Sequence, residues 1–149
     1  MVDVTTSPVR FHYLKSFPFQ DRDRLKRFLV SLFKKENTKL GHLKYIFCSD
    51  AYLLNINRQH LKHDYYTDII TFNLSDDPSV VEGEVYISID RVRDNARTEN
   101  TSFKEEVHRV ILHGALHLCG YNDKSPADIK KMRNAENKYL GIFFSHSTQ

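Results

Sequence analysis

The order of hydrophobic and polar positions separates this chain into strand-like and helix-like segments. Runs that alternate between the two kinds of side chain, or that are rich in β-branched residues, predict four strands, at residues 9–13, 43–48, 69–72 and 85–89. Apolar residues that recur every three or four positions predict five helices, at residues 21–36, 50–61, 90–98, 102–120 and 125–141. Strands mainly in the first half and helices mainly in the second predict an α+β fold, with a roughly four-stranded sheet covered by helices.

Short polar segments mark the expected boundaries of these elements. Gly41 predicts a turn before the second strand, and residues 73–81 predict an exposed connection before the fourth strand. Asp50 is expected to cap the helix that follows it.

The helix predicted at residues 102–120 differs from the others because apolar side chains surround it on most sides. A helix with this pattern is buried, so we expect it at the centre of the domain. The sequence Ser102-Phe-Lys-Glu105 has the form of a capping box, in which each of the two side chains bonds the other residue's backbone N–H. Gly120 is a natural end, because glycine readily adopts the left-handed conformation that terminates helices.

Composition places the chain among ordinary globular proteins. It has 149 residues, 40% hydrophobic and 28% charged, which predicts one domain over residues 1–149. No uncharged apolar run approaches the roughly 20 residues that a membrane-spanning helix needs, and the first eight residues lack the features of a secretory signal. We therefore expect a cytoplasmic protein with no membrane partner. Cys48 and Cys119 form no CxxC motif and are expected to be free, buried thiols.

The charge is only mildly basic. A formal net charge of +3 permits an anionic partner such as nucleic acid without requiring one. Basic residues gather on the first predicted helix, outside its apolar stripe: Arg22, Arg24, Lys26, Arg27, Lys34 and Lys35. Because amphipathic surface helices commonly carry such charges, we interpret them as a solvated face in preference to an RNA-binding patch.

Candidate chemistry lies on the central helix. His113 and His117 are four residues apart, so a helix places them on one face, where they can bind a single metal ion. The alternative is that both rings are satisfied by hydrogen bonds in the core. The metal is favoured because one ion satisfies two neutral imidazoles that face the same buried direction. Gly114 costs about 1 kcal/mol of helix stability relative to alanine, which indicates that another group approaches the backbone there.

A third ligand is expected, because zinc sites that do chemistry usually have three protein ligands and one water. Asp123 is the first strong ligand after the helix ends. Cys119 lies roughly 200° around the helix from His117 and is expected to point away. His108 is expected to act as a cap or to lie on the surface. The predicted metal ligands are His113, His117 and Asp123, which would hold a metal-bound water.

The constellation differs from that of the zinc proteases. In their H-E-x-x-H motif, the glutamate after the first histidine is the general base. Gly114 occupies that position here, which argues strongly against a protease. An iron oxygenase also uses two histidines and one carboxylate, but nothing else in the chain indicates a pocket for a co-substrate.

Three segments together resemble the YbeY family of metal-dependent endoribonucleases, which act in ribosomal RNA maturation. Residues 113–121 match the family signature H-G-x-L-H-L-x-G-Y at every fixed position. Residues 66–72, Tyr-Thr-Asp-Ile-Ile-Thr-Phe, resemble the family's P-T-D-V-L-S-F segment, and residues 83–88 resemble its G-D-I-x-I-S strand. The resemblance covers roughly residues 40 to 140.

The chain departs from the family at two places. The signature continues D-H where this chain has Asn122 and Asp123, so an aspartate replaces the third metal-binding histidine. This harder ligand widens the choice of metal: we expect one divalent ion per chain, Zn²⁺ first, with Mn, Fe or Ni as alternatives. The family arginine that contacts RNA corresponds to Leu61, so Arg58 or Lys62 would have to substitute for it.

The resemblance implies a single-strand-specific, metal-dependent endoribonuclease that acts in maturation of the 16S ribosomal RNA 3′ end and in ribosome biogenesis. The metal-bound water would take part in phosphodiester cleavage. Arg58, Lys62 and Lys124 are the candidate RNA contacts, with an ordinary surface charge as the alternative for each. The expected partners are single-stranded RNA, foremost ribosomal RNA, and the ribosomal subunit or its assembly proteins. Two alternatives stay open: an RNA- or ribosome-binding assembly factor with a structural metal site, and a metallohydrolase of another substrate.

Overall fold

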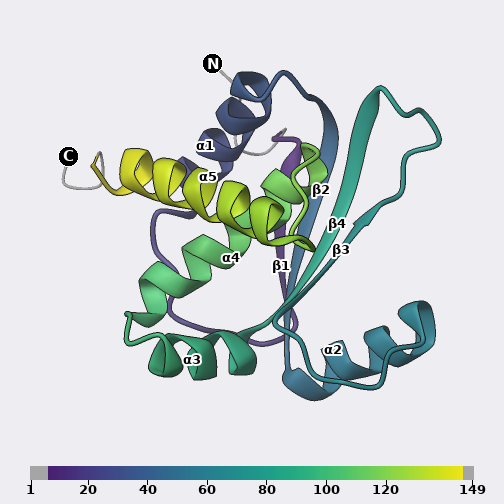
Figure 1. Ribbon diagram of the computed structural model, residues 1–149, viewed down its shortest axis with the longest axis vertical. Helices are drawn as coiled ribbons and strands as arrows, with labels where there is room; N and C mark the ends of the chain where they lie inside the picture. Colours follow the sequence, from purple (N-terminus) through teal and green to yellow (C-terminus); the bar gives the residue numbers. More distant parts are fainter. Residues whose placement is uncertain (1–6, 146–149) are drawn as a thin grey trace.

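The fold is known from a computed structural model that describes residues 7–145 (Figure 1). In chain order its elements are β1 (Val9–Tyr13), α1 (Arg22–Lys35), β2 (Lys39–Cys48), α2 (Asp50–Ile56), the π-helical turn η2 (Asn57–Leu61), β3 (Ile69–Asn73), β4 (Val80–Ser88), α3 (Ile89–Thr98), α4 (Phe103–Leu118) and α5 (Pro126–Ser145). The predicted α+β class is confirmed. Residues 1–6, on which most of the expectation about a secretory signal rests, lie outside the described residues.

The four strands form one sheet in the order β1-β2-β4-β3. β1, β2 and β4 are parallel, and β3 pairs with β4 in the antiparallel direction. The crossover between the parallel strands β1 and β2 is made by α1, as such connections usually are. This order places β1 at one edge of the sheet and β3 at the other.

Helix α4 lies at the centre of the molecule, as predicted. It packs against β3 and β4 on one side and against α5 on the other (Figure 1). Most of its apolar residues lie in the main core, and Ile111, Ala115 and Leu116 are fully buried there. The short helix α2 packs on the opposite face of the sheet, where Leu53 joins a second small cluster with Cys48 and Ile70.

Two strands are longer than predicted. β2 begins at Lys39 and runs through Gly41, where a turn was expected, with a register irregularity between Leu40 and His42. β4 begins at Val80, because Val81 and Gly83 continue the inward alternation of the residues that follow. The connection predicted at residues 73–81 was therefore too long.

The helix caps correct and refine the predictions. Asp50 does not cap α2; the Ser49 hydroxyl accepts a hydrogen bond from the Tyr52 N–H at 3.1 Å, and the Asp50 carboxylate pairs with Arg91 at 2.7 Å. At the start of α4 the Ser102 hydroxyl accepts from the Glu105 N–H at 3.0 Å, as predicted. The Glu105 carboxylate accepts a hydrogen bond from the Thr101 hydroxyl at 2.9 Å.

The prediction that His108 is a cap or surface residue was wrong. Its side chain is buried, and its ring packs against Phe19 and Phe143. Nδ1 lies 2.7 Å from the Lys104 carbonyl oxygen, and burial lowers the pKa of the ring. Phe143 also contacts Phe28 of α1, which is why α5 continues to Ser145 instead of ending near residue 141.

Both cysteines are free, as predicted; Cys48 is buried and Cys119 is half-buried. Within residues 7–145, no helix combines the length and the apolar character needed to cross a membrane.

Gly83 is a position in β4 where packing leaves no room for a side chain. A Cβ atom there would lie 2.6 Å from Leu118 Cδ1 and 2.9 Å from Leu43 Cδ1. We expect Gly83→Ala to lower the free energy of unfolding by about 1 to 3 kcal/mol, because overpacking forces its neighbours to shift. Urea unfolding followed by circular dichroism measures the free energy of unfolding.

Gly141→Ala is the control, because its new Cβ meets no heavy atom of the described residues within 4 Å. The higher helix propensity of alanine should raise the free energy of unfolding of this variant by up to about 1 kcal/mol. Equal stability of Gly83→Ala and the unaltered protein would contradict the packing.

Candidate functional site

Helix α4 carries His113 and His117 on one face because their spacing is close to one helical turn. Gly114 lets this helix lie directly on the sheet: a Cβ there would be 3.0 Å from Val85 Cγ1 and 3.1 Å from Ile69 Cδ1. The close approach predicted at Gly114 is therefore confirmed, and the approaching groups are side chains of β4 and β3. As a result, His113 lies beside the start of β3.

The His113 ring is held by a carboxylate from α5. Its Nδ1 lies 2.7 Å from Oε2 of Glu136, a buried side chain. A carboxylate accepts hydrogen bonds, so in the neutral ring the proton lies on Nδ1, and Nε2 is then the nitrogen that can bind a metal. Arg109 donates to the other carboxylate oxygen of Glu136 at 3.1 Å, and Arg133 lies 3.6 Å from it. Histidine ligands of metals are commonly oriented by a carboxylate in this way.

Asp123 reaches the free nitrogen of the same ring. After Gly120, whose φ of +105° ends the helical segment, the chain returns and places Asp123 Oδ2 3.2 Å from His113 Nε2. Two neighbouring ligands of a tetrahedral zinc ion, each bonded at about 2.0–2.1 Å, lie about 3.3 Å apart. The separation of these two atoms fits two ligands of one ion, and it also fits an ion pair between a protonated ring and the carboxylate.

The electrostatics of His113 call for a cation at this point. When Nδ1 carries the proton, Nε2 presents a lone pair to a carboxylate oxygen, and the two repel unless a positive charge lies between them. Burial by itself lowers the pKa of His113, but the hydrogen bond and charge of Glu136, with the charges of Asp123 and Asp68, outweigh it and raise the pKa. A second ring proton or a metal ion satisfies the arrangement, so this donor set fits a divalent metal.

The three predicted ligands are only partly brought together. His113 and Asp123 are adjacent, whereas the His117 side chain is exposed to solvent one turn further along α4. Within residues 7–145, no three His, Cys, Asp or Glu side chains form a group that could hold a metal ion.

A pocket of about 320 Å³ opens beside His113, between α4, α5 and the start of β3. Its charged lining consists of Asp68, Glu106, Arg109, His113, Asp123, Arg133 and Glu136. Burial raises the pKa of Asp68, although the His113 charge and a hydrogen bond from Asn95 at 3.1 Å act against the shift. Burial also raises the pKa of Glu106. The pocket thus combines carboxyl groups of different proton affinity with two arginines.

The predicted RNA contacts lie elsewhere. Within the described part of the chain, Arg58, Lys62 and Lys124 are outside the lining of this pocket. Arg58 pairs with Asp64, and Lys62 ends the π-helical turn η2 in a left-handed conformation, with φ of 57°. Leu61 of the same turn is 40% exposed. The cations that line the pocket are Arg109 and Arg133.

Sequence reasoning missed Glu136 and Asp68. Glu136 stands on the core face of α5, between Met132 and Tyr139, where the helical pattern leads one to expect an apolar residue. A carboxylate in such a place needs buried partners, and that signal could have pointed to a site. Asp68 lies inside the segment 66–72 that resembles the family, but its chemistry could not be read from that match.

Comparisons with known proteins agree on one family. The family model described as Endoribonuclease YbeY matches residues 15–143. Proteins named Endoribonuclease YbeY are 46% identical over 126 residues in Cytophaga hutchinsonii (85% of this chain, 88% of the relative) and 52% identical over 104 residues in Parabacteroides distasonis (70% and 72%). The one from Flavobacterium psychrophilum is 43% identical over 135 residues (91% and 96%).

A solved structure shows the same fold. The solution structure of TM1509 from Thermotoga maritima aligns with a TM-score of 0.67 at 30% identity, covering 92% of this chain and 89% of that one. The matched residues 15–143 of the family model include every residue of the pocket beside His113.

Proposed function

The chain belongs to the YbeY family of endoribonucleases, and from this membership we propose that its pocket beside His113 cleaves single-stranded RNA with the help of one divalent metal ion. One observation carries the proposal: the His113 ring is fixed at Nδ1 by buried Glu136 and meets Asp123 at Nε2. The substrate we propose is ribosomal RNA during maturation of the 16S 3′ end, with the ribosomal subunit or its assembly proteins as further partners. The family resemblance supports this choice of substrate.

The ligands we propose for the ion are His113, His117 and Asp123. Imidazole nitrogen and carboxylate oxygen suit Zn²⁺, and also Mn, Fe or Ni. A bound ion lowers the pKa of a coordinated water toward neutrality or polarises a non-bridging phosphate oxygen. Glu136 keeps the Nδ1 proton in place, and Nε2 is thereby held free for a ligand bond.

Arg133 is the group that we assign to the substrate phosphate. Its side chain is 54% exposed, whereas that of Arg109 is only 15% exposed and already donates to Glu136. A fixed positive charge at the edge of the pocket stabilises the negative charge that builds on the phosphate during cleavage. Leu61 stands where the family has an arginine, and we assign the phosphate contact to Arg133 instead.

Asp68 is the group that we assign to proton transfer. Asp123 would be a ligand and Glu136 orients His113, which leaves Asp68 and Glu106 among the carboxyl groups of the lining. Asp68 is chosen because it lies at the start of β3 and its charge acts on His113. Its raised pKa brings the carboxyl closer to the range in which a group both accepts and returns a proton.

The open character of the pocket favours an enzyme over a binding protein with a structural metal. Structural zinc sites are closed by four protein ligands. Here Asp123 is 43% exposed and His113 is 24% exposed, so substrate and water can reach the pair.

Cleavage of matched RNA substrates by purified protein tests this function. We expect internal cuts in a single-stranded RNA, little cutting of the same sequence in a duplex, and loss of activity with a chelator that Zn²⁺ or Mn²⁺ restores. The products are separated on a denaturing gel. Undiminished cleavage in the chelator would refute the metal mechanism, and tight RNA binding with no cleavage under any metal would favour the assembly factor.

A further inference from the structure

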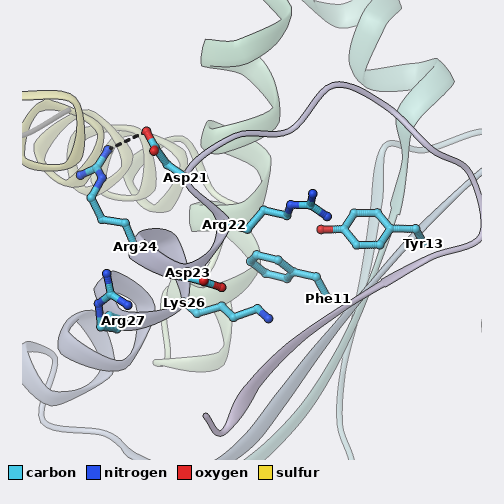
Figure 2. Close-up of a pocket in the computed structure, with 8 residues that line it drawn as sticks. All are labelled: Phe11, Tyr13, Asp21, Arg22, Asp23, Arg24, Lys26 and Arg27. Carbon is cyan, nitrogen blue, oxygen red and sulfur yellow. Dashed lines mark ion pairs between the residues drawn. The ribbon is translucent and has the colours of Figure 1, made fainter. Parts of the chain in front are cut away.

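A second pocket, of about 660 Å³, lies between β1 and the first half of α1 (Figure 2). β1 contributes the aromatic side chains Phe11 and Tyr13, and α1 contributes basic side chains, among them Arg22 and Lys26. β1 is an edge strand of the sheet, so this pocket opens at the margin opposite the one that carries His113. We call it the β1–α1 pocket.

Basic groups lie over aromatic rings in this pocket. The Arg22 guanidinium is 5.5 Å from the Tyr13 ring centroid, and the Lys26 ammonium is 5.3 Å from the Phe11 centroid. Figure 2 shows both side chains reaching from α1 toward β1. Their spacing of four residues places them on one face of the helix. The pocket therefore holds two cations in a row, each positioned by the face of an aromatic ring.

Two buried polar atoms in the lining have no hydrogen-bond partner among the described residues. They are the Tyr13 hydroxyl oxygen and the Nη2 nitrogen of Arg24. Arg24 uses its other nitrogen, Nη1, to donate to the Phe143 carbonyl at 2.9 Å, and Nη2 is 3.8 Å from Asp21 Oδ2 (dashed in Figure 2). Because Arg24 lies over the Phe143 ring of α5 and its Nη2 is within ion-pair distance of Asp21, the Tyr13 hydroxyl is the group of this pocket that lacks a partner among the described residues. Buried polar groups are nearly always paired, and a polar ligand would pair this one.

The position of the cations also favours an anion. The N-terminus of α1 carries the positive end of the helix dipole, where Arg22 is electrostatically unfavourable. Two carboxylates, those of Asp21 and Asp23, stand at the same end of the helix and line the pocket. The four basic side chains of the lining outnumber them and leave it a formal charge of +2. An anion bound here would offset this charge and accept hydrogen bonds from Arg22 and Lys26.

We propose that the β1–α1 pocket is an accessory binding site for single-stranded RNA, in which Arg22 and Lys26, positioned over Tyr13 and Phe11, bind phosphodiester groups of the strand. The inference builds on the proposed ribonuclease function. A positively charged groove that follows the phosphate backbone is one way in which proteins bind single strands without sequence preference. The basic residues of the first helix were interpreted from the sequence as a solvated face. The proposal gives two of them, Arg22 and Lys26, RNA as a binding partner.

The β1–α1 pocket would bind a segment of the RNA that is remote from the phosphodiester bond that is cut. β1 and β3 are separated by three strand spacings of about 4.8 Å, or about 14 Å across the sheet. Contacts at this distance bind substrate and transition state equally. Loss of the pocket should therefore raise KM for long RNA and leave kcat unchanged.

The test compares Arg22→Ala/Lys26→Ala with Lys34→Ala/Lys35→Ala. Both remove two positive charges from α1, but the second pair lies exposed at the other end of the helix. Binding of a labelled 20-nucleotide single-stranded RNA is followed by fluorescence anisotropy over a range of salt, with chelator present. We expect about a tenfold rise in Kd for Arg22→Ala/Lys26→Ala and a salt slope shallower by about 1.4, since each phosphate contact to a single strand contributes about 0.7. The Lys34/Lys35 variant should match the unaltered protein within about twofold.

A charge-preserving variant, Arg22→Lys/Lys26→Arg, should bind like the unaltered protein, and circular dichroism checks that all three variants are folded. Equal affinity of the two alanine variants would overturn the inference, whether both keep or both lose RNA binding. Binding is measured without cleavage, so the two proposals fail separately. A protein that shows the expected binding difference but never cuts RNA refutes the ribonuclease mechanism alone, whereas cutting with no binding difference refutes the accessory site alone.

Discussion

We expect His113→Ala to lower kcat for single-stranded RNA by about 10³-fold or more, because it removes the ligand on which the proposed ion depends. The same variant should lose bound metal. The buried carboxylate of Glu136 keeps its arginine partners, Arg109 and Arg133, when the imidazole is gone. The protein should therefore remain folded. Steady-state cleavage rates and metal analysis of the purified variant measure the two effects.

Two further variants make this result specific. His42→Ala removes an exposed histidine from β2, 57% accessible and remote from α4, and should change neither the rate nor the metal content. Glu136→Gln keeps the shape of the partner of His113 but weakens its hold on Nδ1. A loss of about 10- to 100-fold in metal affinity is expected, as for other groups that orient a ligand. Full metal content and rate in His113→Ala would place the active site elsewhere.

The helical part of the site could be predicted because its signals are local. A four-residue spacing fixes which histidines share a face, and Ser102 and Gly120 mark the two ends of the segment on which they stand. Asp123 could be named as the next candidate ligand from its place just after the helix, and it does lie against His113. Each of these inferences uses only the residues next to the position concerned.

The remaining parts depend on contacts between distant segments, which periodicity does not reveal. The pairing of His113 with Glu136 joins two helices, and only the packing of α5 against α4 shows that the carboxylate points at the ring. The location of His108 was predicted wrongly because its angle on the helix does not reveal which residues cover that side of α4. Phe19 and Phe143 cover it. The order of the strands in the sheet could not be predicted for the same reason. The alternation of apolar and polar residues identifies the buried face of a strand but not the strands that pair with it.

Asp123 gives the second large effect that we expect. Asp123→Ala should lower metal affinity by more than about 100-fold, because loss of a direct ligand costs more than loss of a group that only orients one. Cleavage should fall with the bound metal. The side chain is 43% exposed, and its one ion pair within residues 7–145 joins Oδ2 to His113 Nε2, so stability should change by no more than about 0.5 kcal/mol. Lys124→Ala, in the same loop, is the matched control and should keep its metal.

Asp123→His distinguishes a ligand from a charge. If Asp123 acts through its negative charge alone, histidine cannot replace it, and metal and activity should fall as in Asp123→Ala. If it acts as a ligand, an imidazole nitrogen at this position restores binding and shifts the preference from Mn²⁺ toward Zn²⁺, because nitrogen is the softer donor. We expect the second result, measured by competition between the two metals. Full retention of metal in Asp123→Ala would remove this residue from the ligand set and leave its contact with His113 as an ordinary ion pair.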